Sequence, residues 1–387
     1  MADIADRDTS RSLNRRILRD MSDGIMVVDM SGHVRFMNAA AEDVLGVGFS
    51  QLSGRPFAAT FITDERNDAF SQLIVNATCD KDVVHRDRVD YYLPDAAGAG
   101  GAAGMGVRSS SRRLPHAAAG AVKAAAKGAA TCRSLDLTVS FVYDDGGGKE
   151  GIVVLIEDVT DLVRVEREKR EGIQIFSYGL GLIVVFLFLW QALSAFMEVP
   201  NWLMARIMEL LTLSLAVFAL TRTSMTVKDI GVIATPRQLR VTLVRGAAIG
   251  AAIIALFAVA RLVVDQVMPD ATASIPFFDW HLDEIAQQTY PVVVPFQELL
   301  AKGIVLTALL HIFNGTKRML PLILGSSLLF AAMHVNYGIA MMTGAFALCF
   351  ATGWLYLKDR NIWGCAIVHF CLGFFVTCFG FEQLFLM

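Results

Sequence analysis

Residues 294–305 read VPFQELLAKGIV, and this segment decides the architecture of the chain. It lies in an apolar run long enough to cross a bilayer, yet it contains Gln297, Glu298 and Lys302. A charged side chain near the bilayer centre costs about 2.5–3.5 kcal/mol on insertion scales. Ionisable residues at that depth usually face the interior of a helix bundle and indicate a functional site. The segment therefore predicts a polar site inside a membrane domain.

The composition around this segment divides the 387-residue chain into two parts. The chain is 55% hydrophobic and only 18% charged, which is too apolar for an ordinary soluble enzyme. Charged residues gather in the first 172 positions, and long apolar runs fill the remainder. The opening residues MADIADRDTSRSLNRR lack the apolar core of a signal peptide, so we expect a cytosolic front part. The net charge of −3 excludes a basic nucleic-acid-binding surface.

The second part contains seven apolar runs near the length of about 20 residues that a membrane-spanning helix needs. The runs cover 173–196, 202–221, 241–265, 291–313, 319–336, 338–357 and 361–385. With a cytosolic N-terminus, the inner loops 222–240, 314–318 and 358–360 carry Lys and Arg, whereas the outer loop 266–290 carries only acidic charges. This distribution follows the positive-inside tendency. Residues 173–387 therefore predict an all-α bundle of about seven transmembrane helices, which we expect in a bacterial inner membrane.

The front part predicts an α+β domain, an antiparallel sheet with short helices. Residues 24–37 favour two short strands around a Ser-Gly turn, and Asn38 can cap a short helix that Gly46 stops. Further strands are expected at 81–93, 135–144 and 152–159. The Ala/Gly-rich stretch 95–131 predicts a disordered insertion. Its basic residues are compatible with lipid head groups, but a solvated loop is the simpler interpretation.

Two stretches of the front part, DGIMVVDMSGHVRFMNAAAEDVLG (23–46) and GIVVLIEDVTDL (151–162), resemble a PAS domain. The resemblance covers about residues 11–165, and Asp158-Val159-Thr160 matches the signature with which many PAS domains lead into a helix. It implies a sensor or dimerisation module, with a small ligand and a homodimer through the PAS domain and linker helix as expected partners. The cysteine motif of flavin photosensors is absent. Histidines 33, 85 and 116 are available as haem ligands, although ordinary surface or core positions are the simpler interpretation.

Residues 158–172, DVTDLVRVEREKREG, predict a charged helix with mixed-sign neighbours three and four positions apart. It leads directly into the first apolar run. Two interpretations remain open: a solvated linker, or a signalling helix that couples the sensor to the membrane part.

Polar residues recur inside three of the predicted spans. The fourth span contains Gln297, Glu298 and Lys302, the fifth ends with His334, and the seventh contains His369. Glu298 and Lys302 are four positions apart, so they can pair on one helix face. These residues could also tie helices together by hydrogen bonds without any catalytic role. The six cysteines have no spacing typical of disulfides or a zinc knuckle and are read as packing residues.

The three motifs, in this order, resemble the CPBP family of intramembrane proteases, also called CAAX-protease-like or Abi proteins, over about residues 200–385. The family pattern is Glu-Glu-x-x-x-Arg, then Phe-x-x-x-His, then His-x-x-x-Asn. The chain has Gln297-Glu298-x-x-x-Lys302, Phe330-x-x-x-His334 and His369-x-x-x-Gly373. The resemblance implies that the first acidic residue and the first histidine activate water, and that the later histidine and asparagine stabilise the oxyanion.

The chain departs from this pattern at three positions. Gln297 replaces the expected base and cannot take up its proton, Gly373 lacks the donor of the asparagine, and Lys302 lacks the fork of the arginine. Either Glu298 serves as the base, or the site is a weak or inactive one. A Zn²⁺ ion held by Glu298, His334 and His369 suits these residue types, although no His-Glu-x-x-His motif is present.

We therefore expect a PAS-regulated intramembrane endopeptidase that acts on a peptide or a membrane protein. Its candidate site residues are Gln297, Glu298, Lys302, His334 and His369. The alternative is a non-catalytic membrane receptor or scaffold whose pocket binds a peptide, a lipid or a partner helix. A transporter-like sensor is a third option, which would need a water-filled path past Glu298.

Overall fold

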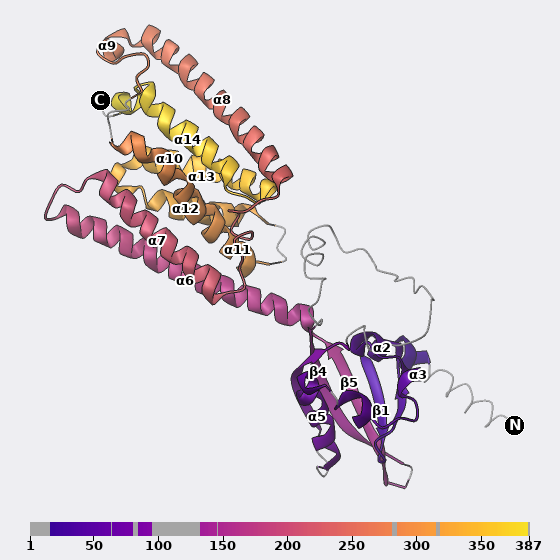
Figure 1. Cartoon of the computed structure of the whole chain (residues 1–387). Helices are drawn as coiled ribbons and strands as arrows, with labels where there is room; N and C mark the ends of the chain where they lie inside the picture. The colour runs from indigo at the N-terminus through magenta and orange to yellow at the C-terminus, as the bar shows by residue number, and fades with distance from the viewer. Residues whose placement is uncertain are drawn as a thin grey trace. The chain divides into compact units, whose positions relative to one another are not determined.

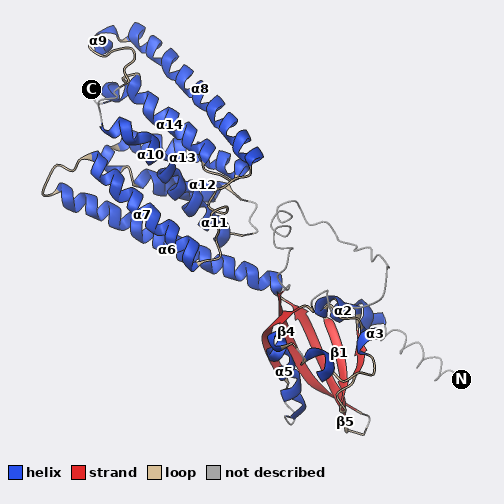
Figure 2. Ribbon diagram, viewed as in Figure 1, coloured by secondary structure: helices blue, strands red, loops and turns tan. Residues whose placement is uncertain are grey.

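The computed structural model describes residues 16–62, 64–79, 84–94, 132–144, 146–280, 285–314 and 318–385. The chain divides into two compact units, Met1–Arg164 and Val165–Met387. Figure 1 follows the chain through both units, and Figure 2 shows that the described strands belong to the first. The predicted insertion 95–131 and residue His116 lie outside the described residues.

The first unit contains one antiparallel sheet of five strands in the order β2-β1-β5-β4-β3. The strands are β1 (Gly24–Asp29), β2 (Val34–Met37), β3 (His85–Tyr92), β4 (Cys132–Tyr143) and β5 (Lys149–Asp158). The helices are α2 (Ala39–Leu45), α3 (Phe49–Leu52), α4 (Ala58–Phe61), a 3₁₀ turn (Glu65–Asn67) and α5 (Asp68–Cys79). The antiparallel sheet with short helices confirms the fold predicted for the front part of the chain.

Asn38 joins the first hairpin to helix α2. Its side-chain oxygen accepts hydrogen bonds from the backbone N–H groups of Ile25 and Ala41, each at 2.9 Å, and its amide donates to two backbone carbonyls. Gly46 ends the helix with a φ of 67°, a conformation that glycine adopts without steric cost. The buried core of the unit includes Met26, Leu45 and Phe70.

A network around Asp29 fixes the turn between β1 and β2. The carboxylate accepts hydrogen bonds from the backbone N–H and hydroxyl of Ser31, from the N–H of His33, and from Arg35. These donors, led by the Ser31 hydroxyl, hold the pKa of Asp29 well below its ordinary value. The ring of His33 contacts the Ser31 hydroxyl at 3.1 Å in this surface turn.

The last strand of the sheet passes into helix α6 (Thr160–Ser194) through Asp158 and Thr160. The Asp158 carboxylate accepts from the N–H of Thr160 at 3.0 Å and from its hydroxyl at 2.5 Å. The Thr160 hydroxyl oxygen accepts from the N–H of Ser134 on β4 at 3.0 Å. The beginning of α6 is thereby bonded to β4, an inner strand of the sheet.

The second unit is helical. It contains most of α6, then α7 (Asn201–Arg222), α8 (Pro236–Val267), α9 (Pro269–Thr272), α10 (Ile285–Glu298), a π-helix (Leu299–Leu306), α11 (Thr307–Ile312), α12 (Leu320–Ala332), a 3₁₀ turn (Val335–Tyr337), α13 (Ile339–Asp359), α14 (Trp363–Cys378) and α15 (Phe381–Phe385). Among the described residues, five helices are long and apolar enough to cross a membrane, while α12 and α14 are apolar but shorter. Several apolar helices are thus present, and the number of spans stays a prediction.

Helix α10 and the π-helix lie in the middle of this unit. Together they pack against α7, α12, α13 and α14, and α14 in turn packs along α8 (Figure 1). Gly246 and Gly250 of α8 face Gly364 and Cys371 of α14 so closely that a methyl group at either α8 glycine would meet atoms within 3 Å. The close packing leaves Glu298 and Lys302 with no exposed surface.

Candidate functional site

Glu298 and Lys302 form a buried ion pair at the junction of α10 and the π-helix. Oε2 of Glu298 lies 3.2 Å from Nζ of Lys302, off the direction of a regular hydrogen bond. Residues 299–306 form the wider turns of a π-helix, a rare conformation that often occurs at functional sites. Nζ of Lys302 also lies 3.1 Å from Sγ of Cys349 on α13.

His369 on α14 completes this buried group. Its Nδ1 lies 2.8 Å from Oε1 of Glu298. Since a carboxylate only accepts hydrogen bonds, Nδ1 is the donor. We call Glu298, Lys302 and His369 the Glu298 cluster. Both oxygens of the carboxylate therefore face a cationic or donor group, and the cluster joins α10, the π-helix and α14.

Gln297 and His334 face a different place, a pocket of about 60 Å³. Apolar side chains make up most of its wall, including Trp190, Met204 and Tyr337. Nδ1 of His334 lies 2.8 Å from the backbone oxygen of Phe330, so Nδ1 donates and Nε2 carries the lone pair of the neutral ring. The side-chain oxygen of Gln297 is buried and has no hydrogen-bond partner among the residues that the structure describes. We call this space the His334 pocket.

Phe330 contacts both halves of the site. Its ring centroid lies 4.8 Å from that of His334 and 5.8 Å from that of His369. Because Gln297 and Glu298 are adjacent in the chain, all five residues singled out from the sequence come together around the end of α10. They do so as two groups, a buried charge cluster and a histidine at a pocket.

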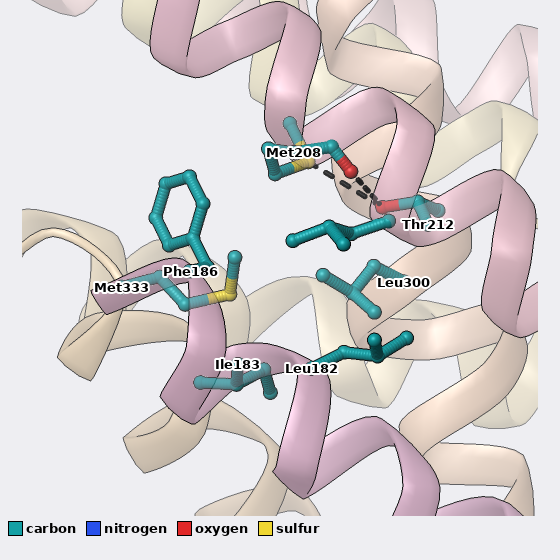
Figure 3. Close-up of a pocket in the computed structure, with 8 residues that line it drawn as sticks. Leu182, Ile183, Phe186, Met208, Thr212, Leu300 and Met333 are labelled. Atoms are coloured by element: carbon teal, nitrogen blue, oxygen red, sulfur yellow. Dashed lines mark hydrogen bonds between the residues drawn. The ribbon is translucent and has the colours of Figure 1, made fainter. Parts of the chain in front are cut away.

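A smaller apolar cavity adjoins the His334 pocket between α6 and α7. Figure 3 shows its lining, in which Leu182 and Ile183 of α6 face Thr212 of α7 across Leu300. The Thr212 hydroxyl donates to the backbone oxygen of Met208 at 2.8 Å, so it adds little polarity. Phe186 lines both spaces, and the pocket is therefore apolar on its α6 side.

The residues do not fit the Zn²⁺ site that their types suggest. Nδ1 of His369 binds the Glu298 carboxylate, and the Lys302 ammonium already lies beside the other oxygen of that carboxylate. A metal ion there would meet a fixed positive charge. In the described part of the chain, no group of three His, Cys, Asp or Glu side chains is arranged to hold a metal ion.

Tyr290 occupies the place that a side chain at Gly373 would need. A β-carbon at position 373 would lie 2.7 Å from Cζ of Tyr290 and closer still to its hydroxyl oxygen. The Tyr290 ring stands edge-on to His369, with 6.2 Å between centroids. Tyr290 could not be singled out from the sequence, because its contact with Gly373 spans more than eighty positions. The sequence shows that position 373 is a glycine, but it does not indicate that Tyr290 fills the space beside it.

The first unit is an antiparallel sheet domain with short helices, and the second is a helical domain with several apolar helices built around a buried polar site. Residues 12–97 match the family model described as PAS fold, and residues 288–375 match the model described as Type II CAAX prenyl endopeptidase Rce1-like. The chain thus carries a PAS domain and an Rce1-like CAAX protease domain, and this combination supports a sensor-linked protease of the CPBP type. No curated protein matches the chain significantly.

Solved structures similar to this chain include PAS domains. A PAS domain from Colwellia psychrerythraea is 11% identical, covering 39% of this chain and 97% of its own, with a TM-score of 0.26. The PAS domain of an HTR-like protein from Haloarcula marismortui is 13% identical, covering 41% and 98%, with a TM-score of 0.26. The PAS domain of BvgS from Bordetella pertussis is 14% identical, covering 40% and 92%, with a TM-score of 0.23.

Proposed function

We propose that this chain is a PAS-regulated intramembrane endopeptidase of the CAAX-protease-like type, and that it hydrolyses peptide bonds in the His334 pocket. The observation that carries the proposal is the pocket itself, which is mostly apolar and is lined by a histidine and an amide side chain from the segment that matches the protease family. Peptide hydrolysis needs a group that accepts a proton from water and a place that excludes bulk solvent.

In this proposal, His334 accepts the proton of the attacking water. Its Nδ1 is engaged by the Phe330 carbonyl, so the lone pair of the neutral ring is at Nε2. Gln297 lines the same pocket, and its unpartnered side-chain oxygen is available to accept a hydrogen bond from that water. An amide positions a water but does not take up its proton. We therefore expect slow turnover, lower by about 10²–10⁴-fold than with a carboxylate base.

The Glu298 cluster has a positioning role in this scheme. Glu298 does not line the pocket, is fully buried and is bonded to His369 and paired with Lys302. A carboxylate held in this way is a poor candidate for the base, since it would have to leave both partners to reach a water. It instead fixes the ring of His369 and, through Phe330, the position of His334.

The amide side chain of Gln297 also favours a second function. Gln297 lies where the resemblance implies a glutamate, and Gly373 lies where it implies an asparagine. A pocket that keeps its shape but lacks these groups suits a receptor or scaffold that binds a peptide, a lipid or a partner helix without cleaving it.

A cleavage assay separates the two functions. The full chain in nanodiscs is incubated with a peptide pool, and wild type is compared with His334→Ala and Gln297→Glu. Cleavage by wild type that is lost in His334→Ala and increased in Gln297→Glu supports the peptidase. A silent wild type with an active Gln297→Glu variant identifies a disabled protease and favours the receptor. Silence in the wild type and in both variants contradicts the peptidase.

The location and partners belong to the same proposal. The Lys and Arg residues of loops 222–240 and 358–360 favour a cytosolic PAS domain on the inner side of a bacterial membrane. Many PAS domains dimerise, so we also propose a homodimer through this domain and α6. A peptide or membrane-protein substrate follows from the protease-type domain.

A further inference from the structure

Helix α6 reaches from the PAS sheet to the wall of the His334 pocket without a break. It runs from Thr160, which is bonded to β4, to Ser194. At about 1.5 Å per residue, its 35 residues span about 50 Å. One face is buried in the second unit at Gly172, Ile175, Gly179, Ile183, Phe186 and Trp190. The spacing of three and four residues places these positions on a single stripe.

The end of this stripe lines the His334 pocket. Trp190 is only 7% exposed, and its ring meets the Tyr337 ring edge-on, with 5.1 Å between centroids. The Tyr337 ring in turn lies 6.1 Å from that of His334. Phe186 adds a second aromatic ring from α6 to the wall. Any movement of α6 along or about its axis therefore changes the wall beside His334.

Two glutamates near the beginning of α6 hold the helix to loops of the second unit. The Glu168 carboxylate accepts from the side-chain amide of Asn314 at 3.0 Å. The Glu171 carboxylate accepts from the backbone N–H and hydroxyl of Ser224, at 2.9 and 2.5 Å. We call Glu168 and Glu171 the tether residues. Glu171 lies 19 residues before Trp190, or about 28 Å along the helix axis.

The helix packs closely between these two points. A β-carbon at Gly172 would lie 2.9 Å from the backbone oxygen of Ala308, and one at Gly179 would lie 3.1 Å from Leu215. Such close contacts at both glycines leave little room for bending, so we expect a displacement of the tethered end to move the buried stripe as one body. The charged segment of α6 is thus attached to the second unit at two points, which favours a coupling element over a solvated linker.

We propose that α6 is the regulatory element of the site, with Trp190 as a gate over His334 and the tether residues as the latch that keeps the gate closed. This inference rests on the proposed function, because a gate regulates catalysis only if the pocket is catalytic. The experiment that tests the gate does not require catalysis. The PAS domain acts on the beginning of α6, and release of the tethers lets Trp190 move away from the pocket.

The test measures access to His334 without measuring proteolysis. The full chain in nanodiscs is treated with diethyl pyrocarbonate, and the rate of His334 modification is followed by mass spectrometry. Trp190→Ala should raise this rate. Phe188→Ala is the matched control, because Phe188 lies two residues before Trp190 on α6 but is 74% exposed. The modification of His369, which is 4% exposed, should stay low and shows that the bundle is intact.

The latch is tested in the same assay with the double variant Glu168→Ala/Glu171→Ala. We expect a roughly threefold to tenfold faster modification of His334, since net hydrogen bonds bias an equilibrium by factors of this size. Glu166→Ala, an exposed neighbour on the same helix, should behave as wild type.

A wild-type rate in Trp190→Ala overturns the gate. A wild-type rate in the double variant, with a raised rate in Trp190→Ala, overturns the latch. Neither result depends on whether any peptide is cleaved. The experiment therefore tests this inference independently of the proposed peptidase activity.

Discussion

Oε1 of Glu298 lies 2.8 Å from Nδ1 of His369, although the two residues are 71 positions apart in the chain. The contact connects the end of α10 to the middle of α14, within a region where neither residue is exposed by more than a few per cent. A carboxylate in such surroundings is tolerated only when it is paired, and here it has both a histidine and a lysine. The contact therefore makes the helix arrangement depend on the same residues that define the candidate site.

Removal of one member of the buried ion pair should destabilise the second unit. Lys302→Met leaves Glu298 without its cation, and breaking a buried pair in this way costs about 3–5 kcal/mol. Thermal unfolding in nanodiscs, followed by tryptophan fluorescence, measures the loss. The double variant Glu298→Gln/Lys302→Met should recover part of it, because no uncompensated charge remains. Equal stability of Lys302→Met and wild type would contradict a buried charge at this position.

A side chain at position 373 should be incompatible with Tyr290. Gly373→Ala places a methyl group on the phenol of Tyr290, and overpacking of this kind costs about 1–3 kcal/mol. Tyr290→Ala alone leaves a cavity, and the methyl group added in Gly373→Ala/Tyr290→Ala lies in that cavity, so the double variant should be at least as stable as Tyr290→Ala alone. The interaction energy from the double-mutant cycle is the deciding measurement. Additive effects would show that the two positions do not touch.

Asn38→Ala should loosen the PAS domain at its first hairpin. The buried amide bonds two N–H groups and two carbonyls, and each buried polar group left unpaired costs about 1–3 kcal/mol. Hydrogen exchange in the full chain should show weaker protection in β1 and α2. Asn76→Ala on the exposed face of α5 serves as the control and should leave this protection unchanged.

The lowered pKa of Asp29 predicts a pH dependence for the same hairpin. A carboxylate with a depressed folded-state pKa stabilises the fold above its ordinary pKa of about 3.9 and loses this effect as the pH falls through its folded value. Protection of β1 and β2, corrected for intrinsic exchange rates, should be lower in Asp29→Asn than in wild type from pH 7 to pH 5. The difference should shrink below pH 4.

The matched control for this pH dependence is Asp43→Asn, which removes an exposed carboxylate on α2. It should follow the wild-type profile at every pH. A constant difference between Asp29→Asn and wild type down to pH 2 would mean that the charge of Asp29 is irrelevant.

The sheet domain could be predicted from sequence because its signals are local. Asn38 and Gly46 bound α2 as predicted, since a capping side chain and a left-handed glycine act within a few residues of the chain. The pairing of Glu298 with Lys302 is equally local, because four residues separate them. These features need no knowledge of the rest of the fold.

The remainder of the site depends on packing between distant segments. The π-helical turns after Glu298, the contact of Tyr290 with Gly373 and the position of Trp190 beside Tyr337 leave no periodic pattern in the sequence. The sequence also places Gln297 and Glu298 side by side without indicating which of them faces the pocket. The division into a charge cluster and a separate pocket required the structure.

The wide turns at 299–306 also limit how the chain length can vary. A π-helix has i→i+5 hydrogen bonds and carries more residues per turn than an α-helix, so it accommodates an extra residue while the helices on either side keep their orientation. The loss of one residue there would let the segment close into regular α-helical turns, with Gln297 and Glu298 near their present orientation relative to α11. The loss of a second residue would have no wide turn left to absorb it and would rotate Gln297 and Glu298 relative to α11 by about 100°. The amide would then leave the pocket, and the carboxylate would leave His369. We therefore expect relatives that share this site to lose at most one residue between Glu298 and Thr307.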